Sequence, residues 1–192
     1  MPKITTADIK NGVTILLDGQ IYQIIEFLHV KPGKGGAFVR TKVKGVVNGK
    51  VLDKTFRSGE TLETVRVERH PYQFLYSDGD MYHFMHNETY EQIMIPADQV
   101  NGSQFIKEGS EVTIVINADD NKILFNEIPD HVNLEVTQTE PGIKGDTAQG
   151  GSKSATLETG AVINVPLFIN EGDVVRVDTQ NAAYIERVKT SS

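Results

Sequence analysis

Hydrophobic and polar residues alternate over short runs along most of this 192-residue chain, with the period of two that is typical of β-strands. The runs are rich in Val, Ile, Thr, Phe and Tyr. Helical periodicity is almost absent, although residues 96–100 could form one short helical or 3₁₀ connector. Dipeptides typical of turns separate the runs: Asn11-Gly12, Asp18-Gly19, Asn48-Gly49, Ser58-Gly59, Asp78-Gly79 and Asn101-Gly102. The pattern predicts an all-β fold.

A motif occurs twice in the second half of the chain: FIKEGSEVTI begins at Phe105 and FINEGDVVRV at Phe168, with five identities in register. In each copy a glycine is expected in a turn before a strand whose Val and Ile side chains alternate inward. Chance similarity of two hairpins is the alternative, but five identities favour duplication. We therefore expect domains at residues 1–64, 65–128 and 129–192. Five-stranded barrels of this size are commonly OB-folds, which contact oligonucleotides.

The first domain holds a glycine-rich loop, HVKPGKGGAF, between two strands expected at residues 21–30 and 37–47. Lys34 should therefore lie exposed at the tip of a hairpin. Alternation along the second strand gathers four residues on one face: Phe38, Arg40, Lys42 and Lys44. The sequence thus predicts a basic stripe that leads toward Lys34.

This loop does not fit a nucleotide-binding loop. That motif is GxxxxGK followed by Ser or Thr at the start of a helix, whereas Lys34 is followed by Gly35 and then a strand. Glycines would instead let the backbone come close to a bulky partner, while Pro32 stiffens one arm of the loop. A surface loop with an incidental lysine is the alternative.

Composition narrows the function classes. The chain has no cysteine, which excludes a disulfide framework, a thiolate zinc site and thiol catalysis. The formal net charge of -7 argues against a nucleic-acid partner, but the average hides a gradient. Residues 1–64 hold ten Lys or Arg against six Asp or Glu, residues 65–128 hold 4 against 11, and residues 129–192 hold 5 against 9. We expect a cytoplasmic protein, since neither a signal peptide nor a membrane span is evident.

Three further patterns could carry chemistry. His83 and His86 form an HxxH, but residues i and i+3 of a strand point to opposite faces and a third metal ligand is not evident. Residues 119–122 resemble part of a calcium loop without its glycine, so we interpret them as a hairpin turn. Five aromatic residues spaced by two are expected in the core rather than stacked on bases: Tyr72, Phe74, Tyr76, Tyr82 and Phe84. We expect neither an enzyme nor a metal site nor a cofactor.

Two stretches resemble bacterial elongation factor P, and the similarity extends over the whole chain. KPGKGGAF resembles the tip of the family's first domain, and GIKGDTAQGGSKSATLETGAVINVPLFINEGDVVRVDT resembles the family's signature region. The signature pattern includes Lys153, Ala155, Gly160, Val165, Pro166 and Gly172. Ser154 departs from it, because relatives commonly have proline at that position.

The resemblance implies three β-barrel domains, an SH3-like or KOW-type barrel followed by two OB-folds, in an L shape similar to a transfer RNA. It implies a translation factor that binds the ribosome between the P and E sites, beside the P-site peptidyl-tRNA and the messenger RNA at the E site. Such a factor relieves stalling at consecutive prolines by positioning the peptidyl-tRNA, while the ribosome remains the catalyst. We expect a monomer without membrane contact.

The family's functional positions map onto this chain by the same resemblance. Lys34 would carry an extension, added by a separate lysine-modifying enzyme, that reaches the acceptor end of the tRNA. Gly145, Asp146 and Thr147 would lie near the messenger codon in the E site. The expected tRNA- and ribosome-binding residues are Lys31, Pro32, Gly33, Lys34, Gly35, Gly36, Arg40, Lys42, Tyr184 and Arg187.

In this family a lysine at the tip goes with amine-bearing additions, such as β-lysyl or 5-aminopentanol groups, whereas an arginine would suggest a sugar. Three alternatives stay open: a paralogue with specialised clients, a generic tandem OB-fold protein that binds single-stranded RNA, and an enzyme that uses the loop for phosphate. The RNA-binding alternative predicts salt-sensitive RNA binding without the ribosome, and the enzyme predicts measurable nucleotide affinity.

Overall fold

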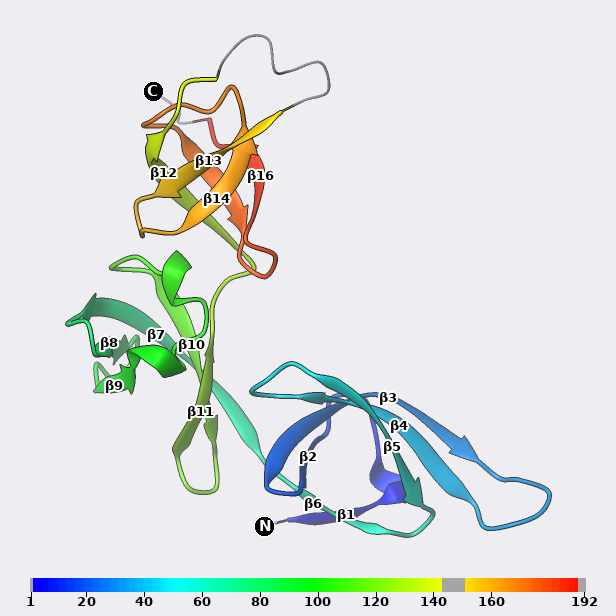
Figure 1. Cartoon of the computed structure of the whole chain (residues 1–192). Helices are drawn as coiled ribbons and strands as arrows, with labels where there is room; N and C mark the ends of the chain where they lie inside the picture. Colours follow the sequence, from blue (N-terminus) through cyan, green and yellow to red (C-terminus); the bar gives the residue numbers. More distant parts are fainter. Residues whose placement is uncertain (1, 143–150, 190–192) are drawn as a thin grey trace. The chain divides into compact units, whose positions relative to one another are not determined.

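The computed structural model describes residues 2–142 and 151–189, and within them the chain forms sixteen strands and three short 3₁₀ helices. The strands make up three sheets (Figure 1). All six glycines of the predicted turn dipeptides have a positive φ, from 68° to 100°. The connector expected at residues 96–100 is the 3₁₀ helix η2 (Ala97–Gln99). The predicted all-β fold is confirmed.

The first sheet has six strands in the order β1-β6-β2-β3-β4-β5. They are β1 (Lys3–Thr5), β2 (Thr14–Leu17), β3 (Gln20–Val30), β4 (Phe38–Gly45), β5 (Val51–Arg57) and β6 (Thr61–Thr64), with the 3₁₀ helix η1 (Thr6–Asp8) after β1. The apolar cluster of this sheet contains Ile9, Ile15, Tyr22, Ile24, Val39, Val43, Phe56 and Leu62. β3 and β4 form a long hairpin whose loop projects from the rest of the sheet (Figure 1).

The second and third sheets have five strands each and share one strand order. The second is β11-β10-β7-β8-β9, built from β7 (Val67–Ser77), β8 (Met81–His86), β9 (Gln92–Pro96), β10 (Glu111–Asn117) and β11 (Lys122–Glu127), with the 3₁₀ helix η3 (Ser103–Phe105) before β10. The third is β14-β13-β12-β15-β16, built from β12 (His131–Thr139), β13 (Ser152–Leu157), β14 (Val162–Pro166), β15 (Val174–Asp178) and β16 (Ala183–Arg187). In each sheet the strand that comes first in the sequence is central: β7 lies between β8 and β10, and β12 lies between β13 and β15.

The sequence repeat is also a repeat of backbone structure. The amide of Gly109 donates to the carbonyl of Phe74 at 2.9 Å, and the amide of Gly172 donates to the carbonyl of Val136 at 2.8 Å. Both glycines have a positive φ, 84° and 89°. An L residue with a side chain would be strained in this backbone conformation. Each copy therefore fastens its turn to the first strand of its own sheet, β7 or β12.

The β10–β11 connection is the hairpin turn expected at residues 119–122. The amide of Asp119 donates to Asn117 Oδ1 at 3.0 Å, and the amide of Lys122 donates to Asp120 Oδ1 at 3.0 Å. Its residues Val115–Phe125 group with the chain up to Arg69 in one compact unit. The second unit contains His70–Ile114 and the residues from Asn126 onward.

The prediction that all five aromatic residues of β7 and β8 lie in the core was wrong for one of them. Four are buried or half-buried, but Tyr76 is 47% exposed. The register shifts between Phe74 and Tyr76, so that Tyr76 pairs with His83. Because a β-bulge adds one residue to a strand, Tyr76 moves to the outer face. There it stacks on His83 with ring centroids 4.2 Å apart.

Candidate functional site

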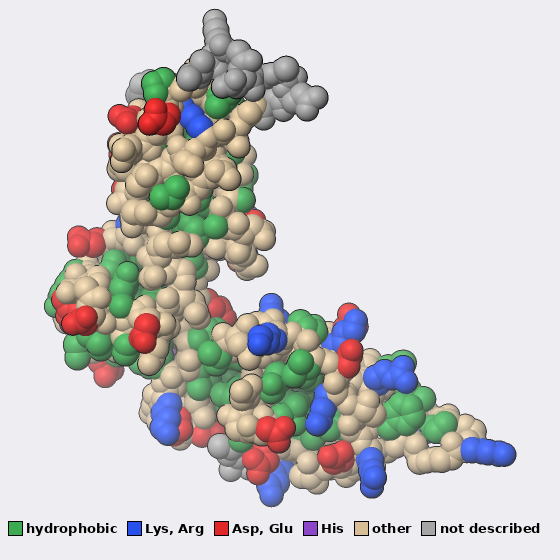
Figure 2. All heavy atoms as spheres, in the orientation of Figure 1, with side chains coloured by type: hydrophobic (Ala, Val, Ile, Leu, Met, Phe, Trp, Pro, Cys, Tyr) green, Lys and Arg blue, Asp and Glu red, His purple; other side chains and the backbone are tan. Residues whose placement is uncertain are grey.

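The glycine-rich loop at residues 31–37 joins β3 to β4, and every residue from Lys31 to Gly36 is exposed. A basic side chain marks the far end of this hairpin in Figure 2. Gly35 has a φ of +102°, which L side chains rarely adopt. A Cβ added at any of the loop's three glycines would meet no described atom within 4 Å. The loop thus presents Lys34 on a bare backbone that a partner can approach closely.

The hairpin behind the loop changes character along its length. β2 pairs with β3 over Gln20–Gln23, close to the core. A register shift between Ile24 and Glu26 then marks a β-bulge in β3. Beyond the bulge the four residues Glu26–His29 are exposed, although their side chains alternate between the two faces. This distal half of β3 is therefore held by its hydrogen-bond ladder to β4 more than by packing.

Burial alternates along β4 in the way the sequence predicts. The buried set is Val39, Thr41 and Val43, and the exposed set is Arg40, Lys42 and Lys44. The hydroxyl of Thr41 donates to the carbonyl of Lys54 at 2.7 Å, so the polar group on the buried face is satisfied. The outer face of β4 thus carries the basic residues.

The charge along this outer face is not uniform. Lys42 Nζ lies 3.6 Å from Glu26 Oε2, and the β4–β5 register places Asp53 opposite Lys42. An exposed ion pair adds little stability, but two carboxylates beside a lysine reduce the positive potential there. Sequence reasoning missed this, because the acids belong to neighbouring strands and the pattern along β4 alone does not show them.

A second basic group lies where β4 leaves the loop. The guanidinium carbon of Arg40 lies 5.8 Å from the centroid of the Phe38 ring. The register pairs Phe38 with Arg57 at the end of β5, and Arg57 is exposed. Two arginines from different strands thus share the outer face with one aromatic ring. Sequence reasoning did not single out Arg57, because only strand pairing brings it to this face.

Tyr184 and Arg187 lie on β16, in the other compact unit. Tyr184 is half-buried and packs against the apolar cluster of the third sheet. Arg187 is exposed: its Nη1 lies 3.8 Å from Asp173 Oδ2, and its guanidinium carbon lies 5.5 Å from the Phe168 ring centroid. Phe168, which is 57% exposed, lines a concave surface of about 620 Å³ together with Tyr184. Phe168 thus contacts Arg187 and shares a concave surface with Tyr184, although sequence reasoning did not select it.

Two sets of residues considered in the sequence remain: three residues of the loop predicted near the E-site codon and two histidines of β8. Gly145, Asp146 and Thr147 lie outside the described residues. His83 and His86 lie on opposite faces of β8, where His83 pairs with Tyr76 and His86 pairs with the buried Tyr72. Within residues 2–142 and 151–189, no group of three or more His, Asp or Glu side chains is placed to hold a metal ion. The same residues contain no helix long and apolar enough to cross a membrane.

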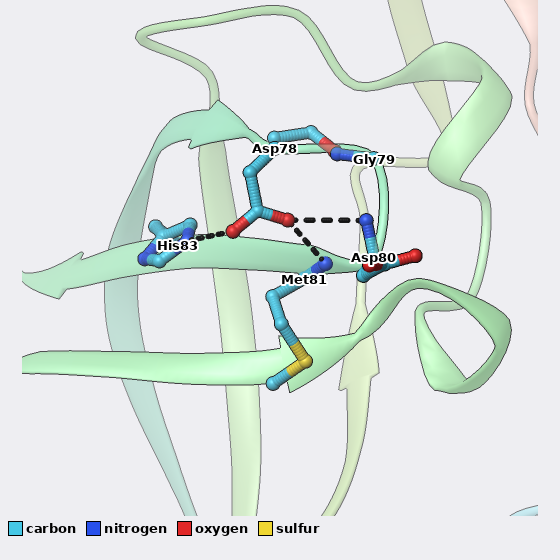
Figure 3. A network of polar contacts seen from close by, with 6 residues as sticks. Asp78, Gly79, Asp80, Met81 and His83 are labelled. Carbon is cyan, nitrogen blue, oxygen red and sulfur yellow. Dashed lines mark hydrogen bonds and ion pairs between the residues drawn. The ribbon is translucent and has the colours of Figure 1, made fainter.

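A polar network orders the β7–β8 turn on the outer face of the second sheet (Figure 3). Asp78 Oδ2 lies 3.1 Å from His83 Nε2, while Asp78 Oδ1 accepts the amides of Asp80 and Met81 at 3.1 and 2.8 Å. The hydrogen bond from His83, followed by those from the backbone, lowers the pKa of Asp78 below its ordinary value. This network shapes the turn and holds the His83 ring against Tyr76.

Comparison with known families accounts for most of the chain. The elongation factor P KOW-like domain matches residues 5–62, the elongation factor P OB domain matches residues 67–124, and the elongation factor P C-terminal domain matches residues 132–187. The chain belongs to the elongation factor P family. As a member of that family it is a translation elongation factor.

Relatives of the elongation factor P family are similar over nearly their full length. The chain is 57% identical to "Elongation factor P" of Azobacteroides pseudotrichonymphae genomovar. CFP2, over 96% of this chain and 99% of the relative. It is 56% identical to "Elongation factor P 1" of Porphyromonas gingivalis, over 96% of this chain and 98% of the relative. Both relatives thus match nearly the whole chain.

Solved structures show a related fold. The structure of "Eukaryotic translation initiation factor 5A from Methanococcus jannaschii" aligns with a TM-score of 0.51 at 25% identity, and covers 66% of this chain and 94% of that one. A "Translation initiation factor eif-5a family protein" from Naegleria fowleri aligns with a TM-score of 0.53 at 16% identity, and covers 66% of this chain and 98% of that one. The second likeness concerns the fold alone.

Proposed function

We propose that this elongation factor binds the ribosome between the P and E sites and stimulates peptide-bond formation, relieving stalling at consecutive prolines through a modified Lys34. The observation that carries the proposal is the position of Lys34: it lies in the exposed, bare loop of a projecting hairpin, in a chain that belongs to the elongation factor P family.

The physical basis is positioning rather than covalent chemistry. Proline is a sterically constrained substrate, so bringing the two reactants into attack geometry is the bottleneck, and positioning of this kind is worth up to about 7 to 11 kcal/mol in favourable systems. Lys34, lengthened by an amine-bearing group, would place a cation against the acceptor end of the peptidyl-tRNA. The exposed glycine-rich loop supports this role because it leaves room for close approach.

The rest of the chain would hold this tip in place. We propose three domains, at residues 1–64, 65–128 and 129–192, with the exposed Arg40 contacting RNA in the first. Tyr184 and Arg187 would face the anticodon stem-loop of the P-site tRNA, and the loop with Gly145, Asp146 and Thr147 would lie near the E-site codon. The acidic balance of the second and third domains disfavours indiscriminate RNA binding, so that a shaped site selects the partner.

A generic single-stranded RNA-binding protein is the second candidate, and one observation favours it. Tyr76 stacks on His83 at the outer face of the second sheet, where an exposed ring could stack on a base. The acidic balance of residues 65–128 counts against it, because phosphate binding needs positive charge. This candidate requires RNA binding without the ribosome and gives Lys34 no special role.

Translation of a Pro-Pro-Pro reporter in a purified system tests the proposal, using protein from its native host whose Lys34 has been examined by peptide mass spectrometry. We expect an added mass on Lys34 and loss of stall relief in Lys34→Ala. Lys50→Ala is the matched control, because Lys50 is an exposed lysine in the connection between β4 and β5, outside the loop. Equal stall relief by wild type and Lys34→Ala would overturn the role of the tip.

A further inference from the structure

We propose that Arg40 and Arg57 form a binding site for an RNA phosphate where the outer face of β4 and β5 meets the Lys34 loop, with Phe38 as the packing surface between the strands. This inference rests on the proposed function, since it assumes that the hairpin enters an RNA-rich site. It adds Arg57, which neither the sequence pattern nor the family match selects, and it lowers the expected importance of Lys42.

The strand register brings the two arginines together. Phe38 pairs with Arg57, and Arg40 pairs with Thr55 two residues earlier on β5, so all four side chains point to one face. Arg40 stacks on Phe38 with its guanidinium carbon 5.8 Å from the ring centroid. This cation–π contact restrains the orientation of a long side chain, so less freedom is lost when the guanidinium binds an anion.

Both guanidinium groups are available for a ligand. Within residues 2–142 and 151–189 neither Arg40 nor Arg57 forms an ion pair, whereas Lys42 on the same face has Glu26 at 3.6 Å. The acid nearest to Arg57 in sequence, Glu60, uses its Oε2 to accept the Arg57 backbone amide at 2.9 Å. Among the described residues, Lys42 is thus the one of these three cations with a carboxylate within ion-pair distance, which lowers the positive potential there.

The chemistry of the pair fits a phosphate. A guanidinium presents a planar fork of N–H donors that matches phosphate oxygens in a bidentate way, which an ammonium group cannot do. Residues 1–64 are also the only basic third of the chain, as RNA binding at this face requires. An acidic protein surface would use the same charges, so the test must separate it from RNA.

The test measures binding of the full chain to ribosomes that carry peptidyl-tRNA, over a series of salt concentrations, for Arg57→Ala and Lys54→Ala. Lys54 is the matched control: it lies on the same strand, is exposed and cationic, and pairs with Thr41 of the opposite face. We expect Arg57→Ala to weaken binding about tenfold and to reduce the slope of log affinity against log salt by about one. The affinity of Arg57→Lys should lie between those of Arg57→Ala and Lys54→Ala, because lysine keeps the charge but lacks the planar fork of N–H donors.

Three results would overturn the inference. Equal affinities and slopes for Arg57→Ala and Lys54→Ala would remove the site. Weaker binding by Arg57→Ala with an unchanged salt slope would exclude a phosphate and indicate a protein contact. A larger effect of Lys42→Ala than of Arg57→Ala would contradict the argument from Glu26. Matching circular-dichroism melting curves establish that each variant is folded.

The same variants in the Pro-Pro-Pro assay separate this inference from the proposed function. If wild type relieves stalls and Lys34→Ala does not, while Arg57→Ala matches Lys54→Ala throughout, only the phosphate site fails. If wild type itself does not relieve stalls, the proposed function fails, and the salt series still reports whether Arg57 contacts RNA.

Discussion

The second and third sheets share a strand order and a turn, yet they treat the first residue of the repeated motif differently. Phe105 is 2% exposed and belongs to the same apolar cluster as Leu134 and Ile163, whereas Phe168 is 57% exposed beside Arg187. The turns themselves are alike in φ and in hydrogen bonds. The motif's own residues therefore determine the turn, while the segments that pack around the motif determine whether the phenylalanine is buried or exposed.

Contacts between distant segments surround the first copy. Lys107 Nζ lies 3.3 Å from Glu158 Oε1, and the same oxygen accepts the amide of Glu135 at 3.0 Å. The hydroxyl of Thr159 donates to the carbonyl of Gln104, next to Phe105. Phe105 thus joins β10's turn to the core of the third sheet, a role that the second copy does not have.

The largest expected effect is the difference in stability between removing the ring of Phe105 and removing the ring of Phe168. Phe105→Ala should lower the free energy of unfolding by about 3 to 5 kcal/mol, because it removes a buried ring and leaves a cavity. Phe168→Ala should cost only about 0.5 to 1 kcal/mol, mainly through the contact with Arg187. Urea unfolding followed by far-ultraviolet circular dichroism measures both. Equal losses would show that the two phenylalanines contribute equally to stability and that the exposed fraction of the ring does not predict its contribution.

A middle-sized effect should be shared by the two copies. Gly109→Ala and Gly172→Ala each force an alanine into a positive φ, which costs about 1 to 2 kcal/mol, and neither meets an atom closer than ordinary contact. Gly36→Ala is the control, because no positive φ or near neighbour opposes a Cβ there. The same urea experiment applies. A loss at one repeat glycine without the other would contradict the structural equivalence of the turns.

The smallest effect concerns two carboxylates that cap different turns in the two sheets: Asp78, which follows β7, and Asp178, the last residue of β15. Hydrogen bonds from His83 and from Asn181, in each case with backbone amides, lower the pKa of Asp78 and of Asp178 below the ordinary value of 3.8. A lowered native pKa stabilises the fold above about pH 4, and this contribution is lost as the pH falls through the native pKa.

Melting temperatures of Asp78→Asn and Asp178→Asn, measured from neutral pH down to below about pH 4, test the effect. The difference from wild type should be greatest near neutral pH and should shrink as the pH falls, because the wild type loses the contribution that the variants lack. Glu88→Gln, at an exposed acid in the β8–β9 turn, is the control. A difference that stays constant with pH would show that the carboxylates cap through shape rather than charge.

Local pattern predicted much of this fold, because alternation and turn glycines act over a few residues. The strands on either side of Lys34, the buried and exposed faces of β4 and the turn at residues 119–122 follow from that pattern. Non-local features did not follow. The bulge that turns Tyr76 outward, the acids beside Lys42 and the pairing of Arg57 with Phe38 depend on register between strands, which one strand's sequence does not contain.

The distal half of β3 has a consequence for how such a hairpin can change. Because Glu26–His29 are exposed, a substitution there removes little buried surface, whichever face its side chain occupies. Mutations in this stretch can therefore alter what the hairpin recognises without a large penalty in folding. The same freedom makes it a graft site, where segments from other members of the family can be exchanged while the core around Ile24 and Val43 keeps the barrel intact.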